Sequence, residues 1–309
     1  MIRIFASLGL IFLTGCGAPT SGPGVLSLNW FPEAEHGGFF QAVINAKGEV
    51  PYRIESGGPD VPVLQKVATG KSDFGVVNAD DVVNAQSQGA DVVALMAPLY
   101  THPRCIMLRK DSGVKSIAEI KNMTLAMSSR PAFSHWLQHK YPFEGVKVVP
   151  YPGSILPFTQ DPKFGQQAYS ISEPFLAKEK GVEPLVLMVS ELGFNPYGSV
   201  LITRRELIEK DPERVRKVVV ASQRGWQLYL QNGEKAHKRI HALNPEMGMD
   251  ILAFGHKEMK KLLDPRVNHP FGTMVAERWQ TLIGQMTECG LIKKDKVKPE
   301  TCFTNQFLE

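Results

Sequence analysis

The 309-residue chain has only four cysteines, and no two of them stand at Cys-x-x-Cys spacing. This scarcity excludes a cysteine-ligated metal centre and a dithiol redox motif. A Gly-x-Ser-x-Gly nucleophile elbow is also absent. Gly70-Lys71-Ser72 matches only the end of a P-loop, and a predicted strand follows it where a helix is required. The sequence therefore offers no nucleophile or phosphate motif of an enzyme.

A strong charge of one sign is lacking too. The formal net charge is +4, and lysines and arginines alternate with acids along most of the chain, so no field for nucleic acid is expected. His135 with His139, and His237 with His241, have the spacing of zinc ligands on a helix. Neither pair has the accompanying glutamate or an identifiable third ligand, so we interpret both as exposed helix faces and expect no metal or cofactor.

Long apolar runs are missing, except for residues 4–13 after Arg3. That run is shorter than the roughly 20 residues that span a bilayer, and it precedes Leu13-Thr14-Gly15-Cys16, which resembles the bacterial lipobox. We expect residues 1–15 to be a lipoprotein signal peptide, with Cys16 acylated and inserted in a lipid bilayer. The alternative is an ordinary signal peptide with a chance cysteine. Residues 16–24, rich in Gly, Pro and Ser, form a flexible tether.

From residue 25 onward, short apolar strands alternate with helices, which indicates an α/β fold rich in parallel strands. The chain is long enough for two domains, and from Asp211 it is mostly helical, with Asp211-Pro212 as a helix start. Asp60 is expected to cap a helix over residues 61–69, and Pro131 to occupy the first position of another. Strands are predicted at residues 25–30, 52–56, 73–78, 92–99, 105–108, 124–127, 146–150, 168–172, 185–189 and 198–203. Among the later cysteines, Cys289 and Cys302 are close enough in sequence to pair, whereas Cys105 reads as a buried thiol.

In open α/β sheets, ligands bind at the carboxyl ends of strands. Residues that follow the predicted strands therefore form a candidate rim: Trp30, Phe31, His36, Gly57, Gly58, Asn78, Asp80, Tyr100, Ser128, Ser129, Arg130, Glu173 and Tyr197. Most have a structural alternative. Asn78, Asp80 and the serines can be helix caps, Phe31 can be buried, and Arg130 can face water. Glu33 and Glu35 can belong either to the rim or to a solvated loop.

Four groups of residues together resemble the extracytoplasmic substrate-binding proteins of ABC importers, in the branch that binds thiamine pyrimidines, riboflavin, nitrate, sulfonates and taurine. They are Trp30-Phe31-Pro32 with His36-Gly37-Gly38-Phe39; residues 63–77 with Leu64, Gly70, Asp73, Phe74 and Gly75; Ser170-Ile171-Ser172-Glu173-Pro174-Phe175; and residues 198–212. The resemblance covers nearly all of the chain after the tether, and it rests on the order and spacing of these motifs.

This resemblance implies a two-lobed periplasmic binding protein fold of type II. Residues 25–104 and 200–309 would form lobe one, with the C-terminal helices packed on it, and residues 105–199 would form lobe two. Segments near Cys105 and Val200 would act as hinges. A ligand would hold the lobes closed, and the closed form would dock on permease subunits outside the cytoplasm.

The balance of charge on the rim bears on the ligand. Nitrate or a sulfonate requires convergent cations, and the rim offers Arg130, His36 and His102 against Glu33, Glu35, Asp80 and Glu173. Aromatic and acidic side chains suit an aromatic heterocycle better, such as a thiamine-precursor pyrimidine or a flavin. The alternatives are an anion binder, an enzyme like the pyrimidine synthases, whose cysteine-rich segment is absent here, and a lipoprotein that has the fold without an importer.

Overall fold

The structure is a computed structural model, and it describes residues 22–46, 48–266 and 268–309. The expected signal peptide, Cys16 and most of the expected tether lie outside the described residues. The last expected tether residue, Gly24, is the first residue of a strand. Within the described part of the chain, no helix combines the length and the apolar character needed to cross a membrane.

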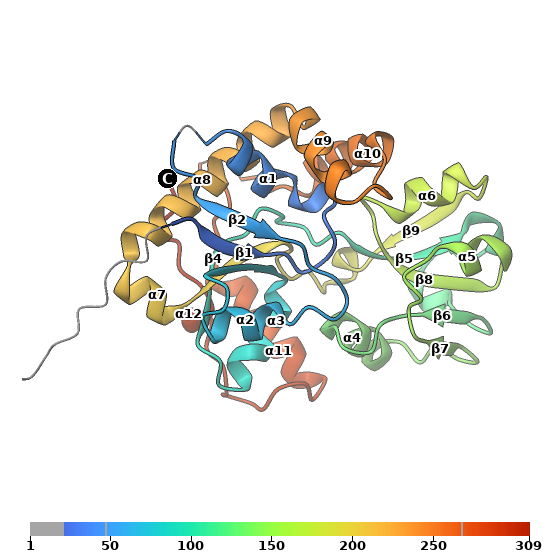
Figure 1. The fold of residues 1–309 in the computed structure, drawn as a ribbon. Coiled ribbons are helices and arrows are strands. Elements are labelled where there is room, and N and C mark those ends of the chain that lie inside the picture. The colour runs from blue at the N-terminus through green and yellow to red at the C-terminus, as the bar shows by residue number, and fades with distance from the viewer. Residues whose placement is uncertain (1–21, 47, 267) are drawn as a thin grey trace, which may run out of the picture.

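Two five-stranded sheets organise the molecule, one in each of two lobes (Figure 1). Lobe one contains the sheet with strand order β2-β1-β3-β10-β4. Its strands are β1 (Gly24–Ser27), β2 (Tyr52–Glu55), β3 (Phe74–Val77), β4 (Val92–Met96) and β10 (Val200–Arg204). Strands β1, β2 and β3 pair in parallel, whereas β10 is antiparallel to both β3 and β4.

The sheet of lobe two has the order β7-β6-β8-β5-β9. Its strands are β5 (Arg104–Arg109), β6 (Thr124–Ala126), β7 (Lys147–Val149), β8 (Phe164–Tyr169) and β9 (Pro184–Met188). Strands β6, β7 and β8 are parallel, and β5 is antiparallel to its neighbours β8 and β9. Each sheet thus has one antiparallel strand, β5 or β10, and in both cases it is the strand by which the chain enters from the other lobe.

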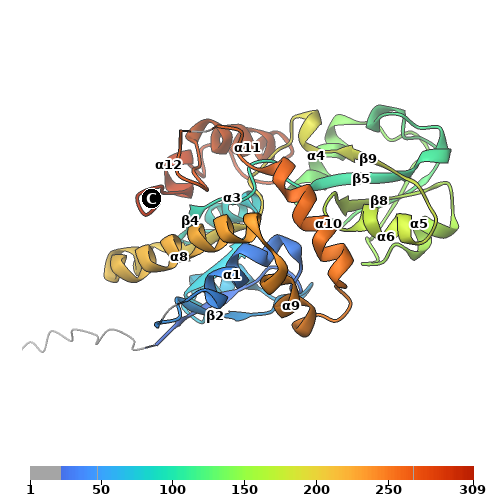
Figure 2. The same ribbon diagram turned by 90° about the horizontal axis from the view of Figure 1, so that it is seen from above.

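Helices cover both faces of the sheet in lobe one (Figures 1 and 2). On one side are α1 (Gly37–Ile44), α8 (Pro212–Gln231), α9 (Glu234–Leu243) and α10 (Met249–Met259); on the other are α2 (Val63–Ala68), α3 (Ala79–Ser87), α11 (Ala276–Glu288) and α12 (Pro299–Cys302). The short helix α7 (Arg205–Lys210) connects β10 to α8. Helices α1 and α8 pack so closely that a Cβ at Gly37 would lie 2.1 Å from the Tyr229 ring, and a Cβ at Gly38 would lie 2.2 Å from the Trp226 ring.

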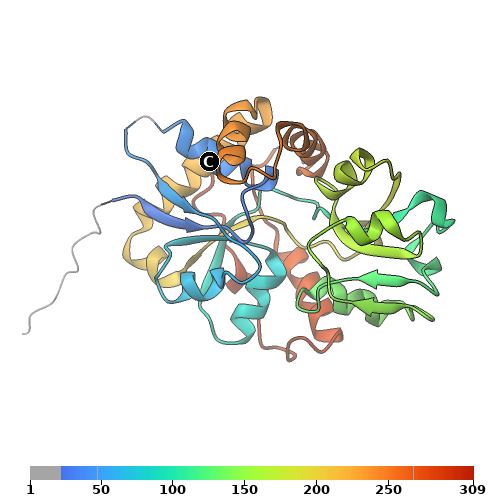
Figure 3. The same cartoon turned by 45° about the vertical axis from the view of Figure 1, so that its right-hand side comes forward.

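Lobe two carries α4 (Ala132–Lys140), α5 (Leu156–Gln160) and α6 (Glu173–Glu179). Single 3₁₀ turns occur at Ala34–His36, Lys110–Ser112, Ile117–Glu119, Ser190–Leu192 and Lys260–Leu262. Residues 97–103 and 189–199 connect the lobes and run side by side between them (Figure 3). At this crossing, Leu99 and Gly198 form an isolated antiparallel bridge.

Several local predictions need correction. Asp60 does not cap α2, because the N-cap residue of that helix is Pro62. Pro131 is the N-cap residue of α4, not its first helical residue. The strand predicted at residues 168–172 begins earlier, at Phe164, and ends at Tyr169. The helix start at Asp211 is confirmed, since its side chain accepts a hydrogen bond from the backbone N–H of Arg214.

The cysteines that the structure describes are free thiols. Cys105 is fully buried, as expected. Cys289 and Cys302 are not paired; Cys302 lies beside the Lys298 carbonyl and the Gln86 side chain.

Candidate ligand site between the two lobes

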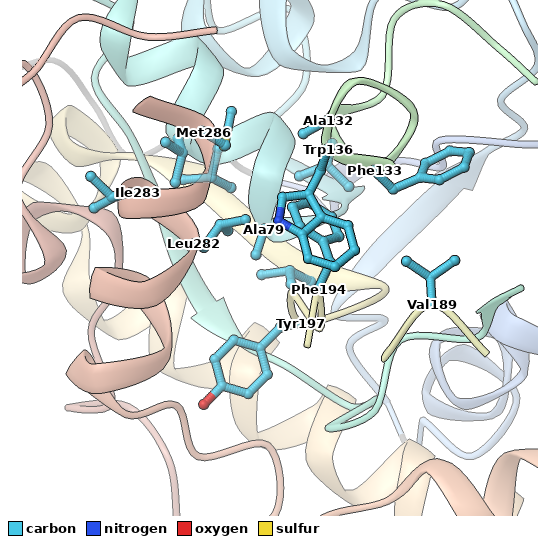
Figure 4. Close-up of a cluster of buried hydrophobic side chains, with 14 of the residues drawn as sticks. Ala79, Ala132, Phe133, Trp136, Val189, Phe194, Tyr197, Leu282, Ile283 and Met286 are labelled. Carbon is cyan, nitrogen blue, oxygen red and sulfur yellow. The ribbon is translucent and has the colours of Figure 1, made fainter. Parts of the chain in front are cut away.

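The lobes contact each other on one side through an apolar cluster (Figure 4). Phe133 and Trp136 of α4 pack in it with Phe194 and Tyr197 from the second crossing segment. The rings of Trp136 and Phe194 are 5.5 Å apart. Leu282, Ile283 and Met286 of α11 belong to the same cluster. This contact holds α4 of lobe two beside the polar groups described next.

The loop after β1 buries two ionisable side chains at the lobe boundary. His36 has no exposed surface and Glu35 is 1% exposed. Nδ1 of His36 accepts a hydrogen bond from the backbone N–H of Glu33 (3.3 Å), so Nε2 donates to Oδ1 of Asn29 (2.9 Å). Burial lowers the pKa of His36 to about 3, which makes it a neutral residue.

Glu35 is held from the crossing segment. The Ser199 hydroxyl donates to Oε2 of Glu35 (3.1 Å), and Ser199 is itself buried with a left-handed φ of 51°. Burial raises the pKa of Glu35 to about 7. Burial also raises the pKa of Glu33 well above its ordinary value, and the charges of Glu35 and Glu173 add to that shift.

Arg104 is the cation of this region. It is the first residue of β5, where the chain enters lobe two. Its guanidinium carbon lies 4.8 Å from the centre of the Phe133 ring and 4.3 Å from that of Tyr169. Burial raises the pKa values of Glu33, Glu35 and Asp80, and the charge of Arg104 offsets part of each rise, yet no salt bridge joins Arg104 to any acid among the described residues. Its Nε is buried and has no hydrogen-bond partner there.

Glu173 stands at the N-terminus of α6 on the lobe two side. It accepts hydrogen bonds from the Tyr151 hydroxyl (2.9 Å), the Tyr169 backbone N–H (2.8 Å) and the Ser172 hydroxyl (2.5 Å). The Glu173 charge is felt by Glu33 and Glu35 of the other lobe. We call the set Glu33, Glu35, Arg104, Tyr151, Tyr169 and Glu173 the inter-lobe cluster.

The N-terminus of α3 contributes direct contacts between the lobes. The backbone N–H of Ala132, the first residue of α4, donates to Oδ2 of Asp80 (3.3 Å). The side-chain amide of Asn78 donates to the Tyr169 hydroxyl (3.4 Å), and its oxygen accepts from the backbone N–H of Ser199 (3.3 Å). Asn78 also forms a capping box with Asp81, so its predicted capping role and its position at the lobe boundary coincide.

The remaining predicted rim residues lie around this region in different ways. Trp30 stacks edge-to-face with Phe31, which is 48% exposed. Gly57 donates its backbone N–H to the Trp30 carbonyl, and Gly58 lies against the Phe31 ring. Ser128 exchanges hydrogen bonds with the Gln167 side chain, and the Ser129 carbonyl contacts His135. Exposed Arg130 donates to the Pro59 carbonyl of lobe one (3.3 Å).

Tyr100 and Tyr197 have a different environment. Both rings pack on the guanidinium of Arg278 from α11, at 4.2 and 4.0 Å from the guanidinium carbon to the ring centre. The Tyr197 hydroxyl also accepts the backbone N–H of Val275 (3.0 Å). These two tyrosines therefore tie both crossing segments to the C-terminal helices. Within the part of the chain that the structure describes, neither tyrosine hydrogen-bonds or stacks on a residue of the inter-lobe cluster.

Sequence reasoning overlooked Arg104, Tyr151 and Tyr169, and it gave Glu35 too little weight. Arg104 could have been found from its position, because it is a charged residue at the start of the first strand after the chain crosses between the lobes. The expected cations His36 and His102 are buried, and burial lowers the pKa of both, so neither supplies positive charge at neutral pH. His237 is also buried, 5% exposed, and hydrogen-bonds the Tyr229 hydroxyl, which corrects its interpretation as part of an exposed face. No metal-holding group of three or more His, Cys, Asp or Glu residues occurs in the described ranges.

Comparison with known proteins places the fold and the family. The family model described as NMT1/THI5 like matches residues 34–236. The riboflavin-binding protein RibY of Chloroflexus aurantiacus is 23% identical over 330 residues, covering 96% of this chain and 91% of that protein. The periplasmic aliphatic sulphonate binding protein SsuA of Escherichia coli superposes with a TM-score of 0.68 at 17% identity, covering 91% of this chain and 92% of SsuA.

An enzyme shares the architecture as well. The desulfurization enzyme DSZB superposes with a TM-score of 0.60 at 12% identity, covering 92% of this chain and 97% of that one. The two-lobed periplasmic binding protein fold is thus confirmed, and this fold carries both binding and catalytic activities.

Proposed function

Because the chain belongs to the NMT1/THI5-like family, we propose that it is the solute-binding component of an ABC importer. It captures a small molecule between its two lobes and presents the closed form to the permease subunits. We place lobe one at residues 25–103 and 200–309 and lobe two at residues 104–199, since Arg104 is the first residue of β5. The protein acts outside the cytoplasm, anchored in a bacterial membrane through acylated Cys16.

The observation that carries this proposal is the inter-lobe cluster. Glu33 and Glu35 come from lobe one, whereas Tyr151, Tyr169 and Glu173 come from lobe two. Buried carboxylates without a partner cation destabilise a protein, and groups with such strongly shifted pKa values are concentrated at functional sites. A solute that bonds to groups of both lobes would stabilise the closed form.

We further propose that the solute is an aromatic heterocycle, such as a flavin or a thiamine-precursor pyrimidine. Aromatic rings are available at Trp30, Phe133 and Tyr169, and carboxylates can accept hydrogen bonds from ring N–H groups. RibY is a riboflavin-binding protein by name, which favours a heterocycle.

A sulfonate is the second candidate, favoured by the structural likeness to SsuA. Against it stands the local charge, since Arg104 is accompanied by Glu33, Glu35 and Glu173. An anion placed there would further oppose the ionisation of Glu33 and Glu35, whose pKa values burial already raises.

Native purification followed by mass spectrometry of the released small molecules tests the proposal. A thermal-shift series with riboflavin, an aminopyrimidine and taurine then ranks the classes, because a ligand at 100 times its Kd stabilises by about 2.7 kcal/mol. Stabilisation by taurine or nitrate alone would rule out the heterocycle. Recovery of a chemically altered ligand would favour an enzyme over a binding protein.

A further inference from the structure

Among the described residues, Arg104 and Arg278 are the half-buried arginines that make no salt bridge, and Arg104 is the one that belongs to the inter-lobe cluster. Arg214 lies 3.1 Å from Asp73, and Arg109 lies 2.6 Å from Asp111. Burial raises the pKa values of Glu33, Glu35, Asp80 and Asp81, and the charge of Arg104 offsets part of each rise. Within the residues that the structure describes, Arg104 nevertheless forms no salt bridge with these acids.

Two aromatic rings fix the Arg104 side chain in place. Phe133 is in α4 and Tyr169 is at the end of β8, so both rings come from lobe two. Stacking on rings leaves the edge of a guanidinium free to donate hydrogen bonds in its own plane. The side chain is therefore positioned as a donor, and its Nε is buried with no partner among the described residues.

The acids opposite Arg104 are positioned as acceptors. Glu35 is held by the Ser199 hydroxyl, and Glu173 by three donors of lobe two. The cation and these carboxylates attract one another but stay beyond salt-bridge distance. One molecule that carries both an acceptor and a donor could therefore bond to the Arg104 guanidinium and to one of these carboxyl groups at the same time.

We propose that Arg104 selects ligands with a carbonyl oxygen next to a ring N–H, as on the imide edge of a flavin or a uracil. Arg104 donates to the carbonyl oxygen, and Glu33 or Glu35 accepts from the ring N–H. This inference rests on the proposed function and narrows it. A simple aminopyrimidine offers amine donors to the acids but no carbonyl to Arg104. Taurine offers sulfonate oxygens and an ammonium group, but no carbonyl beside a ring N–H.

Isothermal titration of the ligand-free protein tests this choice with four probes: riboflavin, N3-methylriboflavin, 4-amino-2-methylpyrimidine and taurine. The variants are Arg104→Met and Arg104→Lys. Arg216→Met is the matched control, because the Arg216 guanidinium also lies over an aromatic ring, Phe307, at 5.6 Å, but on α8 away from the cluster.

The wild type is expected to bind riboflavin, and Arg104→Met to weaken that binding by about 10- to 150-fold, the worth of a hydrogen bond to a charged group. N3-methylation should weaken binding to the wild type, because it removes the donor for the carboxylates. Arg216→Met should change the Kd by less than about twofold. Arg104→Lys retains the charge without the planar fork and gives an intermediate loss, which also keeps the test valid if Arg104→Met does not fold.

Unchanged riboflavin affinity in a folded Arg104 variant would overturn the inference and leave the proposed function standing. Preference of the wild type for 4-amino-2-methylpyrimidine would do the same. Binding of taurine alone would instead remove the heterocycle proposal itself. If none of the probes binds, the molecule released from natively purified protein decides: a carbonyl beside a ring N–H supports the role of Arg104, and its absence overturns it.

Discussion

The two lobes meet through two surfaces of opposite character. On the apolar side, Phe133, Trp136, Phe194 and residues of α11 are buried against each other. On the polar side, Glu35 is buried and lies 3.5 Å from Nε2 of His36, which is neutral because burial lowers its pKa to about 3. Apolar burial stabilises at roughly 25 cal/mol per Å², whereas buried charge without a partner destabilises.

We therefore expect the apolar side to stabilise the contact between the lobes and the polar side to bind the solute. The apolar side is sufficient to hold α4 and α11 together without a solute. The polar side becomes favourable only when something satisfies its donors and acceptors. We expect variants of the first to change unfolding and variants of the second to change binding.

The largest effect is expected for Trp136→Ala on the apolar side. Trp136 is 7% exposed and its ring lies 5.5 Å from Phe194. Truncation of a buried tryptophan leaves a cavity, so we expect a loss of about 3–5 kcal/mol in the free energy of unfolding, measured by urea titration. Leu156→Ala is the control, because Leu156 is 58% exposed and should change stability by less than about 0.5 kcal/mol. A loss below about 1 kcal/mol for Trp136→Ala would mean that this side does not hold the lobes.

On the polar side, Glu35→Gln is expected to increase the free energy of unfolding instead of lowering it. The pKa of Glu35 in the folded protein, about 7, lies above the ordinary value of 4.5. The contribution of protonated Glu35 to the free energy of unfolding is therefore fully present below pH 4.5 and is lost as the pH rises through 7. A shift of this size corresponds to about 3 kcal/mol at pH 8. The ligand-free variant should therefore be more stable than the wild type at pH 8, and the two should converge near pH 4.5.

Thermal unfolding of the two proteins from pH 4.5 to 8 measures this effect. The Gln side chain retains an oxygen to accept from Ser199, so the local hydrogen bond is preserved. Glu179→Gln serves as the control, because Glu179 is exposed to water. Equal pH profiles for wild type and Glu35→Gln would contradict a buried, strained carboxylate.

Much of the fold could be predicted from sequence because its signals are local. Asp211-Pro212 marks the start of α8, and the spacing of Val215, Val218 and Trp226 correctly predicts its buried face. Strand β8 was misplaced because Gln166 and Gln167 break the apolar pattern, although both are buried at 0% and 4% exposure. Leu230 continues the same spacing but is only half-buried, and Tyr229 takes the inner position.

The site was less predictable because burial there is produced by distant segments. The turn containing Glu35 is covered where Ala34, Ile171 and Gly255 meet: a Cβ at Gly255 would lie 2.7 Å from Ala34 and 2.8 Å from the Ile171 carbonyl. No local pattern encodes that meeting. Arg104 likewise owes its importance to Phe133 and Tyr169, which are distant in sequence.

A moderate effect is expected for Asp80→Ala, which links the two sides. Asp80 caps α4 from the other lobe, and α4 has no side-chain cap of its own. Loss of such a cap costs about 0.5–2 kcal/mol, which corresponds to a shift of about 2- to 30-fold from closed to open lobes. Energy transfer between dyes on the two lobes measures the shift. Asp80→Asn retains an acceptor and should restore most of the closed population; an unchanged population in Asp80→Ala would show that the contact does not aid closure.

The smallest effect is expected for Arg130→Ala, at the exposed edge where the two surfaces end. Its guanidinium donates to the Pro59 carbonyl at 3.3 Å, and its side chain is exposed, so water replaces the hydrogen bond at little cost. We expect a change of less than about 0.5 kcal/mol in unfolding and less than about twofold in the Kd for the natively bound ligand. Loss of affinity at tenfold or more, with unfolding unchanged, would restore Arg130 to the ligand contacts predicted from sequence. It would also extend the polar surface outward from Arg104, because two arginines would then share the recognition of the solute and a more anionic ligand would be favoured.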